Sequence, residues 1–127
     1  MPLDTEISEH DLITASRVTD TPVFNPEGER IGRVEDLSIE KVSGRVRYAL
    51  LSFGGFLGMG GHIFPLPWAV LEYDPGRGGY VVPLTKEALE QAPSYTKSEL
   101  EAFGGGDREF RAGLYGYYAP YGAVPYW

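Results

Sequence analysis

Few residues in this 127-residue chain have the chemistry of a catalytic or metal site. The chain has two histidines, His10 and His62, and no cysteine. Thiolate nucleophiles, disulfides, zinc ribbons and cysteine-ligated iron–sulfur clusters are therefore excluded, because each needs a sulfur that the chain lacks. Two histidines alone would make only a sparse metal site. We expect no metal, no other cofactor and no catalytic residue.

The hydroxyl and carboxylate side chains do not form a catalytic pattern either. None of Ser52, Ser94 and Ser98 lies in the G-x-S-x-G turn of a hydrolase, and each suits a cap or a strand position. Glu35 and Asp36 are adjacent, and neighbouring residues of a strand point to opposite faces, which disfavours a shared proton. We expect both carboxylates to face arginines across a hairpin, and we expect no enzymatic activity.

The glycine-rich segment 54–62 is the only sequence that resembles a phosphate-binding loop. Glycines allow backbone N–H groups to converge on an anion. However, no Lys-Ser/Thr pair follows them, and residues 63–65 predict a strand where a phosphate site needs a helix. We interpret the segment as a connecting loop whose apolar residues Phe56, Leu57 and Met59 are exposed and contact a partner.

The end of the chain is aromatic and uncharged. From Ala112 to Trp127 no residue carries a charge, and aromatic rings alternate with glycine and proline, which favours neither a helix nor a central strand. The rings are expected to lie on a surface, either that of the chain itself or a second copy, or that of a different partner. The candidate contact residues are Tyr115, Tyr117, Tyr118, Tyr121, Tyr126 and Trp127.

The elements that would position these residues are mostly short strands. Turn signals at Asn25–Gly28 and at Ser43-Gly44 predict two hairpins, and hydrophobic spacing predicts a β-bulge near Glu35 and Asp36. Such short strands, separated by turns, favour a small barrel or sandwich. The predicted strands are 23–25, 31–42, 45–53, 63–66, 70–74 and 80–84.

Two short helices are predicted after the strands. Thr85 is a candidate N-cap for a helix that ends before Pro93, and Thr96 with Glu99 forms a capping box for the next. Gly104–Gly106 then ends that helix and is the one candidate linker.

Composition restricts the class of partner. A formal net charge of -7 disfavours direct binding to nucleic acid, whose phosphates would be repelled. No run of apolar residues has the length of a membrane span, and the first residues do not resemble a signal peptide. We therefore expect a cytoplasmic protein without a transmembrane segment.

Several segments resemble the PRC-barrel domain, the β-barrel of the photosynthetic reaction centre H subunit. They are Val23–Leu37, Gly44–Gly58, the Phe64–Trp68 segment, and Thr85–Pro93, which resembles the closing segment of stand-alone bacterial members. The resemblance implies a mainly β fold, with a barrel of about six strands followed by two short helices and an aromatic tail. The implied organisation is an N-terminal extension (1–11), the barrel (12–95), a helix with a glycine linker (96–106) and the tail (107–127).

The family resemblance implies an adapter role, as in the H subunit and in a ribosome-maturation factor of the same family. We therefore predict a homodimeric interaction module that contacts an unidentified protein, within a photosynthetic membrane assembly or a ribosome-related one. The alternative is a barrel that binds a quinone or an anion in a pocket near Glu35, His62 and Trp68.

Overall fold

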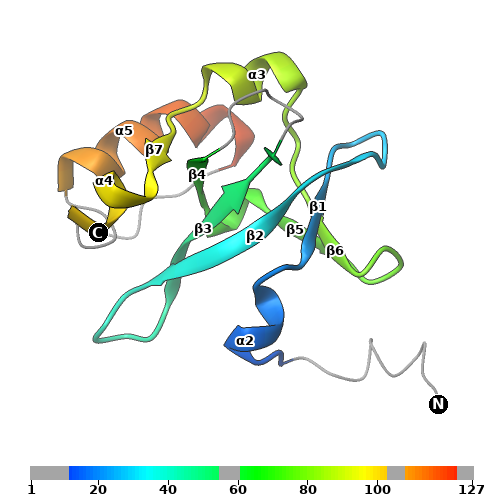
Figure 1. Ribbon diagram of the computed structural model, residues 1–127, viewed down its shortest axis with the longest axis horizontal. Helices are drawn as coiled ribbons and strands as arrows, with labels where there is room; N and C mark the ends of the chain where they lie inside the picture. Colours follow the sequence, from blue (N-terminus) through cyan, green and yellow to red (C-terminus); the bar gives the residue numbers. More distant parts are fainter. Residues whose placement is uncertain (1–11, 55–60, 103–107, 123–127) are drawn as a thin grey trace.

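One twisted sheet carries the fold (Figure 1). The computed structural model describes residues 12–54, 61–102 and 108–122. Seven strands of this part are hydrogen-bonded in the order β5-β6-β1-β2-β3-β4-β7. Their bounds are β1 Pro22–Phe24, β2 Arg30–Ile39, β3 Val46–Ser52, β4 His62–Pro67, β5 Glu72–Asp74, β6 Gly79–Val81 and β7 Tyr95–Thr96.

Helices lie on two sides of the sheet. In Figure 1, α2 lies below the β1 end, whereas α3, α4 and α5 gather on the side of β4. The helical segments are α2 Ala15–Val18, η2 Trp68–Val70, α3 Lys86–Gln91, α4 Lys97–Ala102, α5 Arg108–Tyr118 and η3 Ala119–Tyr121.

The predicted mainly β class is confirmed, and the described sheet has seven strands where a six-stranded barrel was predicted. The described sheet has a seventh, two-residue strand, β7, which pairs with β4. The strand order ends at β5 on one side and β7 on the other, so the sheet is not closed. The pairing of β1 with β6 is parallel, which places β1 between strands that are far apart in the sequence.

The predicted β-bulge is confirmed in the pairing of β2 with β3. Val34 pairs with Leu51 and Asp36 pairs with Leu50, so Glu35 is the additional residue. The turns at both ends of β2 contain glycines in the left-handed region, Gly28 at φ 88° and Gly44 at φ 77°, as the turn signals predicted.

The predicted helix starts are also confirmed. The Ala88 N–H donates to Thr85 Oγ1 over 3.1 Å at the start of α3. Before α4, the Glu99 N–H donates to Thr96 Oγ1 and the Thr96 N–H donates to Glu99 Oε1. This reciprocal pair is the capping box that the sequence predicted.

The expectation that the tail forms no helix is wrong. Residues 108–118 form α5, and Pro120 lies in the first turn of η3, where its missing N–H costs no hydrogen bond. The physical reason is burial, because Leu114, Tyr115 and Tyr118 are 1%, 4% and 0% exposed. Packing of one helix face outweighs the low helix propensity of the glycines.

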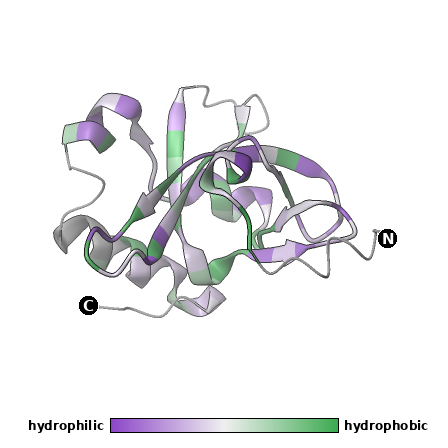
Figure 2. Ribbon diagram, turned by 90° about the horizontal axis from the view of Figure 1, so that it is seen from below, coloured by the Kyte–Doolittle hydropathy of each residue, from purple (hydrophilic) through white to green (hydrophobic). Residues whose placement is uncertain are grey.

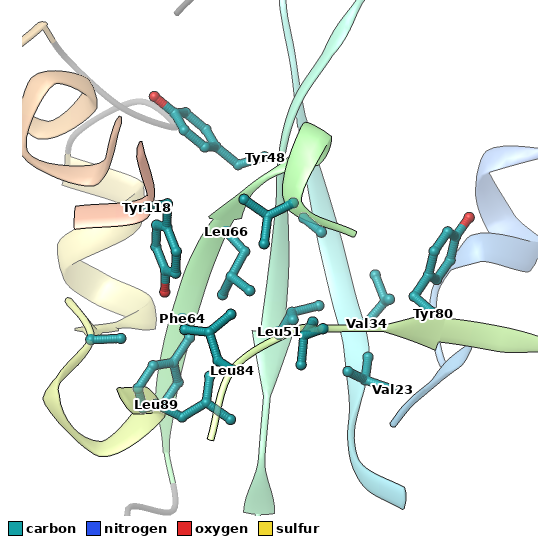
Figure 3. Close-up of a cluster of buried hydrophobic side chains, with 14 of the residues drawn as sticks. Val23, Val34, Tyr48, Leu51, Phe64, Leu66, Tyr80, Leu84, Leu89 and Tyr118 are labelled. Carbon is teal, nitrogen blue, oxygen red and sulfur yellow. The ribbon is translucent and has the colours of Figure 1, made fainter. Parts of the chain in front are cut away.

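The hydrophobic core runs from the strands β1, β2 and β6 to the C-terminal helices. Figure 3 shows Phe64 and Leu66 of β4 near Tyr118, and Leu51 of β3 further from it, toward Val34. Figure 2 shows hydrophobic and hydrophilic residues mixed along the ribbon, whereas the second half of β4, residues 64–67, is buried on both faces.

Candidate functional site

The hairpin between β2 and β3 projects from the sheet (Figure 1). Its connecting turn carries an apolar side chain, Val42, that is almost fully exposed. We call residues 39–45 the hairpin tip. Val42 is 99% exposed and Ile39 is 48% exposed. A β-branched apolar residue that is almost fully exposed gains nothing from the fold, so the hairpin tip is a candidate contact surface.

Hydrogen bonds give the hairpin tip a defined shape. The Glu40 N–H donates to the Arg45 carbonyl over 2.8 Å, and the Gly44 N–H donates to the Glu40 carbonyl over 2.9 Å. The Ser43 hydroxyl donates to Glu40 Oε1 and accepts from the Arg45 N–H. A turn held by four hydrogen bonds loses little further entropy when it binds, which favours recognition.

An ion pair anchors the hairpin tip to the core. Arg47 is only 6% exposed, and its Nη2 lies 2.6 Å from Glu40 Oε2. The hydrogen bonds from Ser43 and then from Arg47 lower the pKa of Glu40, and the bond to Glu40 raises the pKa of Arg47. Glu40 therefore stays ionised and paired within the hairpin, and Lys41 and Arg45 are exposed residues on either side of the Val42–Gly44 turn.

Only some of the predicted contact residues belong to the part of the chain that the structure describes. Five lie outside it: Phe56, Leu57, Met59, Tyr126 and Trp127.

The other four predicted contact residues lie on α5 and η3. Tyr115 and Tyr118 are buried in the chain's own core and have no surface for a partner while α5 is docked. Tyr117 and Tyr121 are half-buried, and the Tyr117 hydroxyl donates to the Ala88 carbonyl over 2.5 Å. Of the two alternatives for the tail, packing on the chain itself therefore holds for Tyr115 and Tyr118.

The three residues predicted for a ligand pocket are not brought together. His62 begins β4 and its Nδ1 lies 3.2 Å from Ser94 Oγ, whereas Trp68 follows the other end of β4 and packs edge-on against Tyr80. Glu35 lies on β2, where its carboxylate pairs with Arg33 over 2.8 Å.

An open groove of about 350 Å³ lies elsewhere, beside β2 and the end of β3. Arg33 in this groove is already paired with Asp20 and Glu35. Arg30 has no ion-pair partner among the residues that the structure describes. The lining residues are Arg30, Ile31, Gly32, Arg33, Ser52, Phe53 and Gly54.

Sequence reasoning missed both the hairpin tip and this groove. The sequence pattern predicts Val42 at the end of a strand, although its position directly before the Ser43-Gly44 turn is a signal that it leaves the sheet. No comparable signal marks the groove, because it depends on how β2 and β3 pair.

The described residues, 12–54, 61–102 and 108–122, hold no group of three or more His, Asp or Glu side chains placed to bind a metal ion. They also contain no helix with the length and hydropathy needed to span a bilayer.

Comparison with known proteins identifies the family. A search of curated proteins found no match. The family model for the PRC-barrel domain matches residues 10–89, which include the hairpin tip, the open groove and every strand except β7. This match covers more than half of the 127 residues and agrees with the mainly β fold. The chain therefore belongs to the PRC-barrel domain family.

Proposed function

We propose that this PRC-barrel chain is a non-enzymatic interaction module that forms a homodimer and docks on a larger protein assembly. The observation that supports docking is the hairpin tip, where Val42 is 99% exposed on a turn held in shape by Glu40 and Arg47. A rigid, exposed apolar group is a typical anchor of a protein interface.

The charges at the hairpin tip indicate the chemistry of the partner. Lys41 and Arg45 flank Val42 on a chain whose net charge is -7. A local cationic surface on an acidic protein favours a partner whose carboxylates surround an apolar depression. Nucleic acid fits less well, because the remaining acidic surface would repel its phosphates.

Photo-crosslinking in cells tests the docking surface. The photoreactive residue p-benzoylphenylalanine replaces Val42 in one variant and Glu90, an exposed residue of α3, in the matched control. We expect discrete crosslinked partners from position 42 that are absent from position 90 and that disappear when Lys41→Glu and Arg45→Glu are added. Identical crosslinks from both positions would exclude the hairpin tip as the docking surface.

Light scattering tests the homodimer. We expect the purified full chain to have about twice the 14.0 kDa mass of one chain. A mass of one chain at micromolar concentration would contradict the dimer and leave the docking proposal to the crosslinking result.

A second candidate function, binding of a small anion, is favoured by the open groove. Arg30 lines it without an ion-pair partner in the described part of the chain, and Ser52 adds a hydroxyl. This candidate keeps the anion of the sequence-based alternative but proposes the groove as its binding site, in place of a pocket near Glu35, His62 and Trp68. A saturable rise of the melting temperature with inorganic phosphate, lost in Arg30→Ala but kept in Arg17→Ala, would support it.

A further inference from the structure

A second exposed apolar pair lies directly before α2. The side chains of Leu12 and Ile13 are 90% and 52% exposed. Arg17, in the last turn of α2, is exposed and has no ion-pair partner among the residues that the structure describes. We call residues 12–17 the α2 patch. Its composition matches that of the hairpin tip, which also presents exposed aliphatic side chains beside exposed cations.

The core and β2 hold the α2 patch in place. The Val18 side chain is 3% exposed and packs in the core. The Asp20 N–H donates to the Val34 carbonyl over 2.7 Å, and the Val34 N–H donates to the Thr21 carbonyl over 2.9 Å. The Asp20 carboxylate also pairs with Arg33 of β2. The α2 patch is therefore attached to β2 at Val34.

The α2 patch and the hairpin tip lie on the same side of the molecule. In Figure 1, α2 and the turn between β2 and β3 both lie along the lower edge. From Val34 to the start of the hairpin tip at Ile39, β2 extends over about 17 Å, at about 3.3 Å per residue. A protein interface of standard size, about 800 Å² per partner, is about 30 Å across. One partner can therefore cover both places.

Most of the exposed large hydrophobic side chains belong to these two places. The described part of the chain has five such side chains, and all except Tyr73 of β5 lie in the α2 patch or the hairpin tip. A specific interface takes about 20 to 30 residues from each side, which residues 39–45 alone do not supply. A partner of the hairpin tip therefore needs further contact area, and the α2 patch offers apolar area of the same kind.

The charges on this side favour a protein over a bilayer as the occupant. Cations lie in both the α2 patch and the hairpin tip, whereas the carboxylates of Asp20 and Glu35 lie where α2 meets β2 and share one arginine, Arg33. The surface of an anionic bilayer is negative everywhere and would repel these carboxylates. A protein can place its own carboxylates opposite the two cationic places alone.

We propose that the α2 patch and the hairpin tip form one combined surface that binds a single acidic protein. This inference rests on the docking function proposed above and extends its surface. The partner buries Leu12, Ile13 and Val42 together and places carboxylates opposite the cations of both places. Binding to both gives the interface the area that the hairpin tip alone lacks.

Photo-crosslinking in cells from three positions of the full chain tests the combined surface. In separate variants p-benzoylphenylalanine replaces Leu12, Val42 or, as the control, Glu90 of α3. We expect mass spectrometry to identify the same protein from positions 12 and 42, joined through two different acidic segments, and to find it absent from position 90.

The outcomes separate the combined surface from the docking function. A partner captured from position 42 but not from position 12 overturns the combined surface and leaves the hairpin tip as the docking site. Capture from position 12 alone, or from neither position, overturns both. Crosslinks from position 12 to the chain itself or to a second copy also overturn a different protein as its occupant. Sedimentation of the purified chain with phosphatidylserine vesicles, lost in Arg17→Glu, would assign the surface to a membrane instead.

Matched variants test whether the α2 patch contributes to binding. With p-benzoylphenylalanine at position 42, Arg17→Glu should lower the crosslinking yield about fivefold or more, because carboxylates then face one another. Ile13→Ser, which keeps every charge, should lower it as well. Lys97→Glu, the same charge change at an exposed residue of α4, should leave the yield unchanged. Equal losses in Arg17→Glu and Lys97→Glu, at unchanged melting temperatures, would contradict a contact through the α2 patch.

Discussion

Arg47 Nη2 lies 2.6 Å from Glu40 Oε2, and the same guanidinium interacts with Tyr115 of α5. One buried arginine therefore connects the hairpin tip, the central strand β3 and the C-terminal helix. The hairpin tip and the C-terminal helix share this side chain, so a change at Glu40 is expected to affect both.

Glu40→Gln tests this connection through pH. The pKa of Glu40 is lowered in the folded state, so its contribution to stability is complete above the ordinary glutamate pKa of about 4.3 and is lost as pH falls through the lowered value. The variant should melt below the parent chain at pH 7, and the difference should shrink as the pH falls below the ordinary glutamate pKa of about 4.3. Glu90→Gln, in an exposed part of α3, is the control and should show no such difference. A pH-independent difference would mean that the amide disturbs packing rather than the ion pair.

Two adjacent tyrosines should respond oppositely to the loss of a hydroxyl. Tyr118→Phe removes a buried hydroxyl that has no partner in the described part of the chain, and should leave stability unchanged or raise it by up to about 1 kcal/mol. Tyr117→Phe removes the bond to the Ala88 carbonyl and should cost about 1 kcal/mol. Urea unfolding with unchanged m-values would measure both effects.

Destabilisation by Tyr118→Phe comparable to that of Tyr117→Phe would show that the Tyr118 hydroxyl is satisfied, for example by an ordered water.

Local chemical signals allowed much of the fold to be predicted from the sequence. The caps at Thr85 and Thr96, the glycine turns and the bulge at Glu35 each depend on residues within a few positions of one another. Such features follow from hydrogen bonding and φ preferences that a short segment carries with it. The family resemblance and the later family match agree on the same part of the chain.

The incorrect predictions concern features that depend on distant contacts. The helix α5 forms because Leu114 and Tyr118 bury against strands about 50 residues earlier in the chain, which outweighs two glycines. The open ends of the sheet at β5 and β7 likewise reflect long-range pairing. Among the site residues, burial of Tyr115 and exposure of Val42 could not be read from residue type alone.

Gly32→Ala should be among the most destabilising small substitutions in the chain. A Cβ at this position would lie 2.2 Å from the Ser52 carbonyl oxygen and 2.8 Å from Phe53 Cδ1, so β2 and β3 would have to separate. We expect a loss of about 2 to 4 kcal/mol, as for an overpacked core. Gly116→Ala meets no atom within 4 Å and should instead stabilise by about 0.5 to 1 kcal/mol. Urea midpoints of the two variants that shift in the same direction would contradict this assignment.

Val42→Ser should separate binding from stability. Val42 is 99% exposed, so its replacement should change the unfolding free energy by no more than about 0.5 kcal/mol. Leu66→Ala, which truncates a fully buried side chain, should cost about 2 to 5 kcal/mol in the same assay. With p-benzoylphenylalanine at position 39, on the half-exposed side of the hairpin tip, Val42→Ser should reduce partner crosslinking severalfold, because the apolar anchor is lost. Undiminished crosslinking by a stably folded Val42→Ser chain would show that the partner recognises the cations Lys41 and Arg45 without Val42.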